Sequence, residues 1–181
     1  MARIQRRCGQ SLIESCVVMG ILCLLLMGLF QLSQLYMAQE IMHYAAGRGA
    51  RARAVGFNDF MVHKSVRVAT IAAAGPMESS MRSDLPTGGP LAQRGIERAR
   101  IPLYMGADHY GLLRPILDYE DWDTISHSLL EQDDPARVDC RVRQDFPVST
   151  VVFKAFYGDD SVPLRGSAAM DSHYPLYLYL P

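Results

Sequence analysis

A single carboxylate interrupts the most apolar stretch of this 181-residue chain. The run from Leu12 to Phe30 contains 19 residues, and Glu14 is its one charged side chain. A carboxylate within a membrane helix costs roughly 2.5–3.5 kcal/mol at the bilayer centre and less near an end of the helix. Glu14 therefore needs either a cationic partner or a side-chain path to the membrane interface. The first reading makes Glu14 a charge-pairing residue, and the second gives it no special role.

The apolar run that carries Glu14 predicts a membrane-spanning helix. At 1.5 Å per residue, a helix over Leu12–Phe30 is about 28 Å long, close to the ~30 Å thickness of a bilayer's hydrocarbon core. Backbone amides in lipid must be hydrogen-bonded within the segment, which requires a helix. Arginines precede the run at Arg3, Arg6 and Arg7. They favour a cytoplasmic N-terminus, with the rest of the chain on the other side of a single span.

Three other interpretations of the N-terminus fit less well. A cleaved secretory signal would need small residues before the cut, and the nearest candidate, Tyr36–Ala38, begins with a tyrosine. A lipoprotein signal would need small residues before Cys16 or Cys23, where Glu14 and Leu22 lie instead. A twin-arginine signal would rest on two adjacent arginines, which are common before any membrane helix.

The residues around Glu14 form a recognisable pattern. The basic segment Arg6-Arg7-Cys8-Gly9 is followed by Gln10-Ser11-Leu12-Ile13-Glu14 and then by the apolar helix. This arrangement resembles the leader of type IV prepilins. In that family a membrane aspartyl peptidase cuts after the glycine, and the fifth residue of the mature chain is a glutamate. The resemblance implies cleavage between Gly9 and Gln10, and pairing of Glu14 with the new N-terminal amine of a neighbouring subunit.

A second stretch narrows the resemblance. Residues 45–51 read Ala-Ala-Gly-Arg-Gly-Ala-Arg, which is similar to the stretch after the membrane helix in TadE-like pseudopilins of tight-adherence (Tad/Flp) pilus systems. The resemblance implies a minor pilin of the inner membrane, with a cytoplasmic N-terminus and a periplasmic C-terminal domain, which also enters the pilus if it is assembled. It further implies a part in pilus assembly, cell adhesion or a related secretion apparatus. The implied partners are the prepilin peptidase, other pilin subunits, Tad assembly proteins and membrane lipid.

A second hypothesis keeps the membrane helix without the processing. In it, the chain is a bitopic inner-membrane scaffold or partner-binding protein that is not cleaved. An enzyme is a third and weaker hypothesis, because Ser, His and Asp occur without a nucleophile-elbow motif and Gly88-Gly89 does not follow a strand. We expect no cofactor and no catalytic residue.

The domain organisation follows from the helix. We expect a leader over residues 1–9, a transmembrane and stalk helix over 10–55, and an exterior domain over 56–181. No proline occurs between Gln31 and Ala54, and Gly47, Gly49 and Gly56 weaken the last turns, so the helix should bend or end near Val55. Apolar positions at helical spacing predict its packed stripe as Leu32, Leu35, Tyr36, Met42 and Ala46.

The exterior part predicts an α+β fold of short helices and a small antiparallel sheet. Asn58 or Asp59 can cap a helix that ends near Ala74. The remaining elements are listed by range: an exposed loop over 78–90, a helix over 91–104, two short helices around 114–115 and 121–122, strands over 137–146 and 162–170, a loop or short helix over 148–157, and an apolar tail over 174–180. The second strand is expected to break at Gly166.

Polar clusters elsewhere do not predict a metal site or a nucleic-acid site. The acidic run Asp118–Asp123 lacks the glycine of a Ca²⁺ loop and predicts a solvated helix start, and the five histidines show no ligand spacing. The formal net charge of −1 argues against nucleic-acid binding. Its distribution is uneven, because residues 1–100 hold 12 basic and 6 acidic side chains and residues 101–181 hold 6 and 13. Cys140 is expected to be a small buried strand residue.

Overall fold

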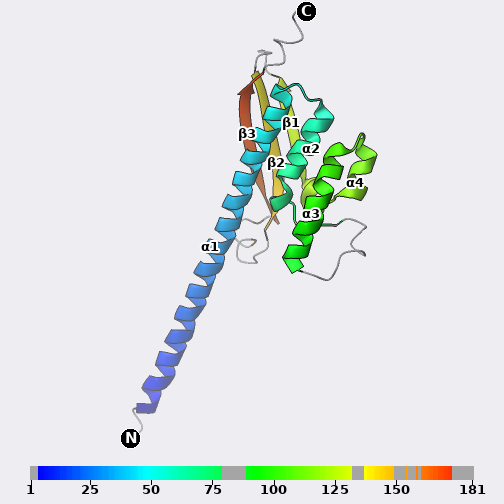
Figure 1. Ribbon diagram of the computed structural model, residues 1–181. Helices are drawn as coiled ribbons and strands as arrows, with labels where there is room; N and C mark the ends of the chain where they lie inside the picture. Colours follow the sequence, from blue (N-terminus) through cyan, green and yellow to red (C-terminus); the bar gives the residue numbers. More distant parts are fainter. Residues whose placement is uncertain are drawn as a thin grey trace, which may run out of the picture. The chain divides into compact units, whose positions relative to one another are not determined.

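The fold of most of the chain is defined by a computed structural model. The residues it describes are 4–78, 89–131, 137–148, 154, 158 and 160–172. They form a long N-terminal helix, several short helices and a three-stranded antiparallel sheet (Figure 1). The α+β class expected from the sequence is therefore confirmed.

The first element, α1, is one continuous helix over Ile4–Ala54. It ends at the glycine-weakened position that the sequence predicts. Gly56 has a φ of +96°, which is a left-handed conformation that a residue without Cβ adopts at no steric cost. The Gly56 N–H donates to the Arg53 carbonyl at 2.8 Å, and the Phe57 N–H donates to the Ala52 carbonyl at 3.1 Å. These two bonds are those of a Schellman motif, and they satisfy carbonyls that the end of the helix leaves without partners.

The chain divides into two compact units, and α1 contributes to both. One unit consists of Met1–Met37 and Pro147–Val162, and the other of Ala38–Phe146 and Pro163–Pro181. The first unit therefore contains the apolar part of α1. The second contains the last turns of α1, the short helices and nearly all of the sheet.

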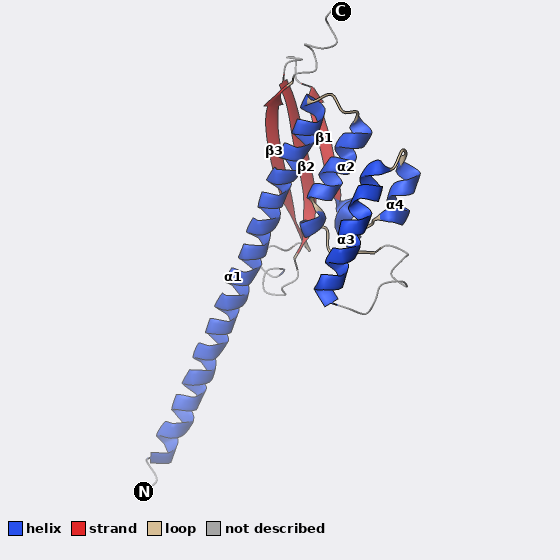
Figure 2. Ribbon diagram, in the orientation of Figure 1, coloured by secondary structure: helices blue, strands red, loops and turns tan. Residues whose placement is uncertain are grey.

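The sheet has the strand order β1-β2-β3 (Figure 2). Its strands are β1 over Ile125–Glu131, β2 over Arg137–Pro147 and β3 over Ser161–Asp171. The two strands expected at 137–146 and 162–170 are confirmed as β2 and β3. Strand β1 was not predicted, since the sequence indicates only two short helices, around 114–115 and 121–122, in this part of the chain. Its inward positions include His127, which interrupts the apolar alternation by which a strand is recognised.

Gly166 does not break β3, contrary to the expectation from the sequence. The strand continues through it from Ser161 to Asp171. A Cβ built on Gly166 would overlap the backbone of Met42 in α1. Glycine is therefore present because the helix and the strand approach each other closely, and not because the strand ends there.

The last turns of α1 pack on the sheet through small side chains. The buried residues of this segment include Ala38, Met42, Ala45, Ala46, Gly49 and Ala50. Of the predicted stripe, Met42 and Ala46 are buried as expected, whereas Leu32 and Tyr36 are more than half exposed. The prediction was wrong there: both residues precede Ala38, where the part of α1 that packs on the sheet begins.

Helix α2 runs over Asp59–Ala69 and is capped by Asn58, as predicted. The Asn58 Oδ1 accepts a hydrogen bond from the Met61 N–H at 3.0 Å. The helix is shorter than expected: it ends at Ala69, and a 3₁₀ turn over Ile71–Ala73 takes the place of the last predicted turn. Alanines are good helix formers, but the change to the tighter turn lets the Ala73 carbonyl accept a hydrogen bond from the buried Gln144 amide at 2.7 Å.

The other helices enclose an aromatic core. Helix α3 spans Gly89–Gly106, α4 spans Leu113–Ile116, and 3₁₀ turns cover Tyr110–Leu112 and Glu120–Thr124. These agree with the predicted helix over 91–104 and with the two short helices that follow it. The fully buried residues of this core include Tyr104, Leu117, Tyr119 and Trp122.

Several predicted segments lie outside the described residues. They are most of the loop over 78–90, most of the segment over 148–157, and the apolar tail over 174–180. Gly89 and Pro90, at the end of the predicted loop, belong to the first turn of α3.

Candidate processing and subunit-pairing site

Gly9, Gln10 and Glu14 all lie on α1, so the geometry of one helix sets their spacing. Gln10 and Glu14 are four residues apart and therefore share a face of the helix, with Cβ atoms roughly 5–6 Å apart. Side chains on an α-helix lean toward its N-terminus, so the Glu14 carboxylate is directed toward the Gln10 end. The helix thus places the predicted cut and the predicted acid about one turn apart.

Glu14 is exposed on this helix. Within the described part of the chain it makes no ion pair. The neighbouring polar group is satisfied locally, because the Ser15 hydroxyl donates to the Ser11 carbonyl at 2.8 Å. This bond removes a hydroxyl from competition for the carboxylate and lowers the cost of placing serine in an apolar helix. Among the described residues around the predicted cut, Glu14 is therefore a charged group without an ion-pair partner.

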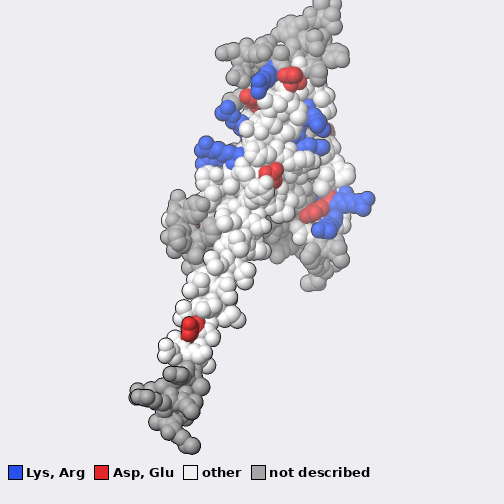
Figure 3. Space-filling view, turned by 90° about the vertical axis from the view of Figure 1, so that its left-hand side faces the viewer, with Lys and Arg blue, Asp and Glu red and all other residues white. Residues whose placement is uncertain are grey.

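The surface around Glu14 is apolar. Exposed side chains from Leu12 to Phe30 include leucines, valines, isoleucines, methionines and a phenylalanine, most of them more than half exposed. Figure 3 shows this part of α1 as a pale rod with one acidic patch; the sequence places no charge other than Glu14 between Gln10 and Gln39. A soluble surface rarely exposes so large an apolar area, which requires lipid or other helices to cover it.

The length of this helix suits a bilayer. The segment Gln10–Ala54 is long and apolar enough to cross a membrane, judged by its length and composition, and its most apolar part is not buried in the structure. The chain is thus compatible with a single-pass membrane protein.

The Ala45–Arg51 stretch is a packing motif in the structure. Ala45, Ala46 and Ala50 are fully buried, whereas Arg48 and Arg51 are exposed. A Cβ built on Gly49 would lie 2.7 Å from the Cys140 Sγ of β2 and 2.9 Å from Val66 of α2. The small residues therefore allow α1 to lie close against β2 and α2.

Cys140 itself is fully buried on β2, as expected from the sequence. Burial raises the pKa of its thiol to about 11, so the thiol stays protonated at neutral pH.

The acidic run Asp118–Asp123 begins a 3₁₀ turn, close to the predicted helix start. Asp123 accepts a hydrogen bond from the Arg114 guanidinium at 2.6 Å and lies 3.8 Å from that of Arg67. Among the described residues, no group of three or more His, Cys, Asp or Glu side chains could hold a metal ion.

Sequence reasoning missed a cluster of buried basic groups between α2 and its neighbours. The Lys64 ammonium is almost fully buried and donates to the Met105 and Ala107 carbonyls at 2.7 and 2.8 Å, which caps the end of α3. The rings of His63 and His127 lie 5.1 Å apart between α2 and β1. Burial, together with the charges of Arg67 and His127, lowers the pKa of His63 to about 4.

Comparison with known families gives one match. Residues 9–51, about a quarter of the chain, match a family model described as TadE-like protein. No curated protein and no solved structure matches the chain. The match runs from Gly9 to Arg51 and therefore includes Glu14 and the small-residue stretch, and it confirms the resemblance to TadE-like proteins.

Proposed function

We propose, from the TadE-like character of residues 9–51, that the chain is a minor pilin that takes part in assembling a tight-adherence type IV pilus or a related secretion apparatus. In this role it is a substrate of the prepilin peptidase and a structural partner of other pilin subunits, without catalytic activity of its own. The observation that carries the proposal is Glu14: a lone carboxylate on an exposed apolar helix, one turn after Gly9-Gln10.

Cleavage after Gly9 would change the electrostatic environment of Glu14. In the uncut chain α1 begins at Ile4, so Glu14 lies in the helix interior. After the cut, the helix begins at Gln10 and Glu14 is its fifth residue. Free N–H groups and a new amine then give that end of the helix a positive potential, which stabilises a nearby carboxylate. Processing thus lowers the electrostatic energy of the ionised Glu14 carboxylate.

The same amine can attract the Glu14 carboxylate of a neighbouring subunit. Glu14 in lipid is destabilising by itself, and an amine close to it removes that penalty. When helices pack side by side, the carboxylate of one subunit can meet the amine of the next. Such a contact, formed away from water, fixes the axial register of the two helices as well as adding attraction.

The proposed topology follows from the flanking charges. Arginines at positions 3, 6 and 7 would remain in the cytoplasm until the peptidase removes them. The second unit, with its sheet and aromatic core, would then lie in the periplasm. Lipid would cover the apolar surface of α1 before assembly, and other pilin helices would cover it afterwards.

Intact mass of the membrane-extracted protein tests the proposal. When a prepilin peptidase is co-expressed, the mass should fall by that of residues 1–9. The change Gly9→Val should prevent this loss, because a branched side chain at the cut obstructs access to the peptide bond. Gly20→Val is the matched control: it lies on the same helix with nothing within 4 Å of its Cβ, and it should leave processing unchanged.

An unchanged mass with an active peptidase would contradict the proposal. That result would favour the bitopic scaffold that is not processed. Loss of processing in both glycine variants would show that the valine acts through the helix as a whole and not at the cut.

A further inference from the structure

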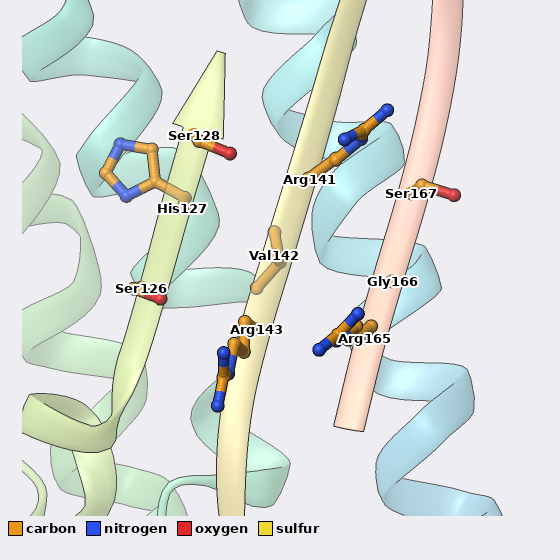
Figure 4. Close-up of a pocket in the computed structure, with 9 residues that line it drawn as sticks. All are labelled: Ser126, His127, Ser128, Arg141, Val142, Arg143, Arg165, Gly166 and Ser167. Atoms are coloured by element: carbon orange, nitrogen blue, oxygen red, sulfur yellow. The ribbon is translucent and has the colours of Figure 1, made fainter. Parts of the chain in front are cut away.

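The face of the sheet opposite the helices carries a cluster of arginines and serines. Its members, called the basic face here, are Arg141, Arg143, Arg165, Ser126, Ser128 and Ser167. They line a hollow of about 770 Å³ on the second unit of the chain. Figure 4 shows Arg141 and Arg143 on β2 and Arg165 on β3, with serines on the two outer strands.

Strand geometry places these residues together. Val138, Cys140 and Val142 of β2 are buried toward the helices, so Arg141 and Arg143 lie on the opposite face. The register pairs Ser128 with Arg141 and Ser126 with Arg143. Directly opposed residues have Cβ atoms roughly 4.5–5.5 Å apart, so each serine lies beside the base of an arginine side chain.

Strand β3 adds the third arginine at a fixed position. The Arg165 carbonyl accepts a hydrogen bond from the Gln39 amide of α1 at 2.6 Å, and the next residue, Gly166, lies against the α1 backbone. These two contacts hold β3 against the helix. The Arg165 side chain is exposed and extends toward β2, while Arg141 leans toward β3 (Figure 4).

The basic face has more positive charge than its own carboxylates neutralise. Arg143 lies 3.3 Å from Asp145, which is its ion-pair partner. Arg141 and Arg165 have no ion pair among the residues that the structure describes. The Arg141 and Arg165 guanidiniums extend toward each other between β2 and β3, so their charges repel. An anionic group bound between them would relieve this repulsion.

The spacing of the arginines indicates the form of the anion. Arg141 and Arg143 are two residues apart on one strand, which is about 6.8 Å. An extended peptide directs every second side chain to the same side with the same repeat. We propose that the basic face docks an extended acidic segment of a partner protein, whose carboxylates alternate with small or neutral residues. The serine hydroxyls would complete the hydrogen bonds to each carboxylate.

Two other polyanions fit the face less well. Single-stranded nucleic acid is bound through aromatic side chains that stack on bases, and the described residues that line this hollow include no Phe, Tyr or Trp. Anionic lipid is bound by clusters of about four to eight basic residues. Four arginines lie on this side of β2 and β3, but Arg137 and Arg143 pair with Asp139 and Asp145. Among the described residues this leaves two arginines, Arg141 and Arg165, without an ion pair, fewer than such a cluster needs.

A binding measurement tests this proposal on the purified full-length chain in a neutral detergent. The probe is a short dye-labelled peptide in which Glu and Thr alternate. Its binding is measured by fluorescence anisotropy. We expect binding that weakens as salt is added, and that falls about tenfold in the double variant Arg141→Gln, Arg165→Gln. The matched control is Arg94→Gln, Arg98→Gln, which removes the same charge from exposed positions on α3 and should leave affinity unchanged.

Further binding measurements distinguish an extended acidic peptide from other ligands of the basic face. A peptide of the same composition with its glutamates in one block should bind more weakly, since it cannot match the strand repeat. Equal binding of both peptides, or an equal loss in both double variants, would overturn the proposal. Tighter, Arg141- and Arg165-dependent binding of single-stranded DNA or of phosphatidylglycerol vesicles would also overturn it. None of these results depends on cleavage after Gly9, because the uncut chain is used.

Discussion

Gly166 of β3 lies directly against the backbone of Met42 in α1, with no room for a side chain between them. The same helix meets β2 at Gly49, whose hypothetical Cβ would be 2.7 Å from the Cys140 Sγ. Glycines from both elements therefore determine how closely the last turns of α1 approach the sheet. This contact joins α1 to the second unit's core, and its energetics can be measured one glycine at a time.

The first prediction concerns Gly166→Ala. Its methyl group would meet helix backbone, which cannot rotate away as a side chain can, so we expect the free energy of unfolding to fall by about 2–3 kcal/mol. Urea unfolding followed by fluorescence measures this, because Trp122 is the only tryptophan and is fully buried. Gly95→Ala in α3 is the control: its Cβ meets nothing within 4 Å, so this variant should be unchanged or slightly stabilised. Equal stability of the two variants would show that α1 and β3 do not pack as described.

The second prediction separates two glycines of the Ala45–Arg51 stretch. Gly47→Ala should stabilise the chain by roughly 0.5–1 kcal/mol, because its Cβ meets nothing within 4 Å and alanine favours a helix. Gly49→Ala should destabilise it, because the methyl group would overlap Cys140 and Val66. Adding Cys140→Ala to Gly49→Ala should recover part of the loss by removing the sulfur. Stability that responds equally to both glycine changes, or no recovery in the double variant, would contradict the close contact.

The third prediction is a loss of stability in mild acid that depends on His63. Burial, with Arg67 and His127 nearby, lowers the pKa of His63 in the folded chain from 6.5 to about 4. As pH falls below 6.5, the unfolded chain takes up a proton that the folded chain does not bind. The contribution of neutral His63 is therefore complete above pH 6.5 and is lost progressively toward pH 4. We expect the loss to be roughly 1–2 kcal/mol, because His63 is only half-buried and solvent screens part of the effect.

Urea unfolding at several pH values checks this. The change His63→Gln should flatten the dependence of stability on pH between 6.5 and 4, whereas His109→Gln, at an exposed position, should not. Parallel curves for the wild type and His63→Gln would mean that His63 does not titrate with folding. His127 adds a smaller effect of the same sign, since burial also lowers its pKa.

The long helix and its end could be predicted from the sequence for simple reasons. An apolar run without proline requires a helix in lipid, and Gly56 ends that helix because its positive φ suits a Schellman motif. The alternation in β2 was equally direct, because Val138, Cys140 and Val142 point to one side and charged residues to the other. In each case a local pattern determines the local structure.

What could not be predicted depends on contacts between distant segments. Gly166 looks like a strand breaker until Met42, more than a hundred residues away, is seen against it. Lys64 looks like an exposed helix residue, yet it is buried because its ammonium reaches the end of α3. The basic face could not be predicted either, since Arg165 is brought beside Arg141 and Arg143 only by the pairing of β2 with β3.

The predicted processing and pairing residues were found in a different way. A resemblance at Gly9, Gln10 and Glu14 identified them, and the match over residues 9–51 agrees with it. The structure adds that all three lie on one continuous helix and that Glu14 is exposed there. Their roles in cleavage and pairing remain predictions.

The most direct test of the pairing is the recovery of Glu14→Ala with pili or with the assembly complex. The variant should enter the membrane at least as well as the wild type, because it removes a carboxylate from lipid. Its recovery in isolated pili or complexes should fall at least about tenfold, because the contact with the neighbouring amine is lost. Glu40→Ala, an exposed acid farther along α1, should be recovered like the wild type. Equal recovery of Glu14→Ala and the wild type would contradict a pairing role for Glu14.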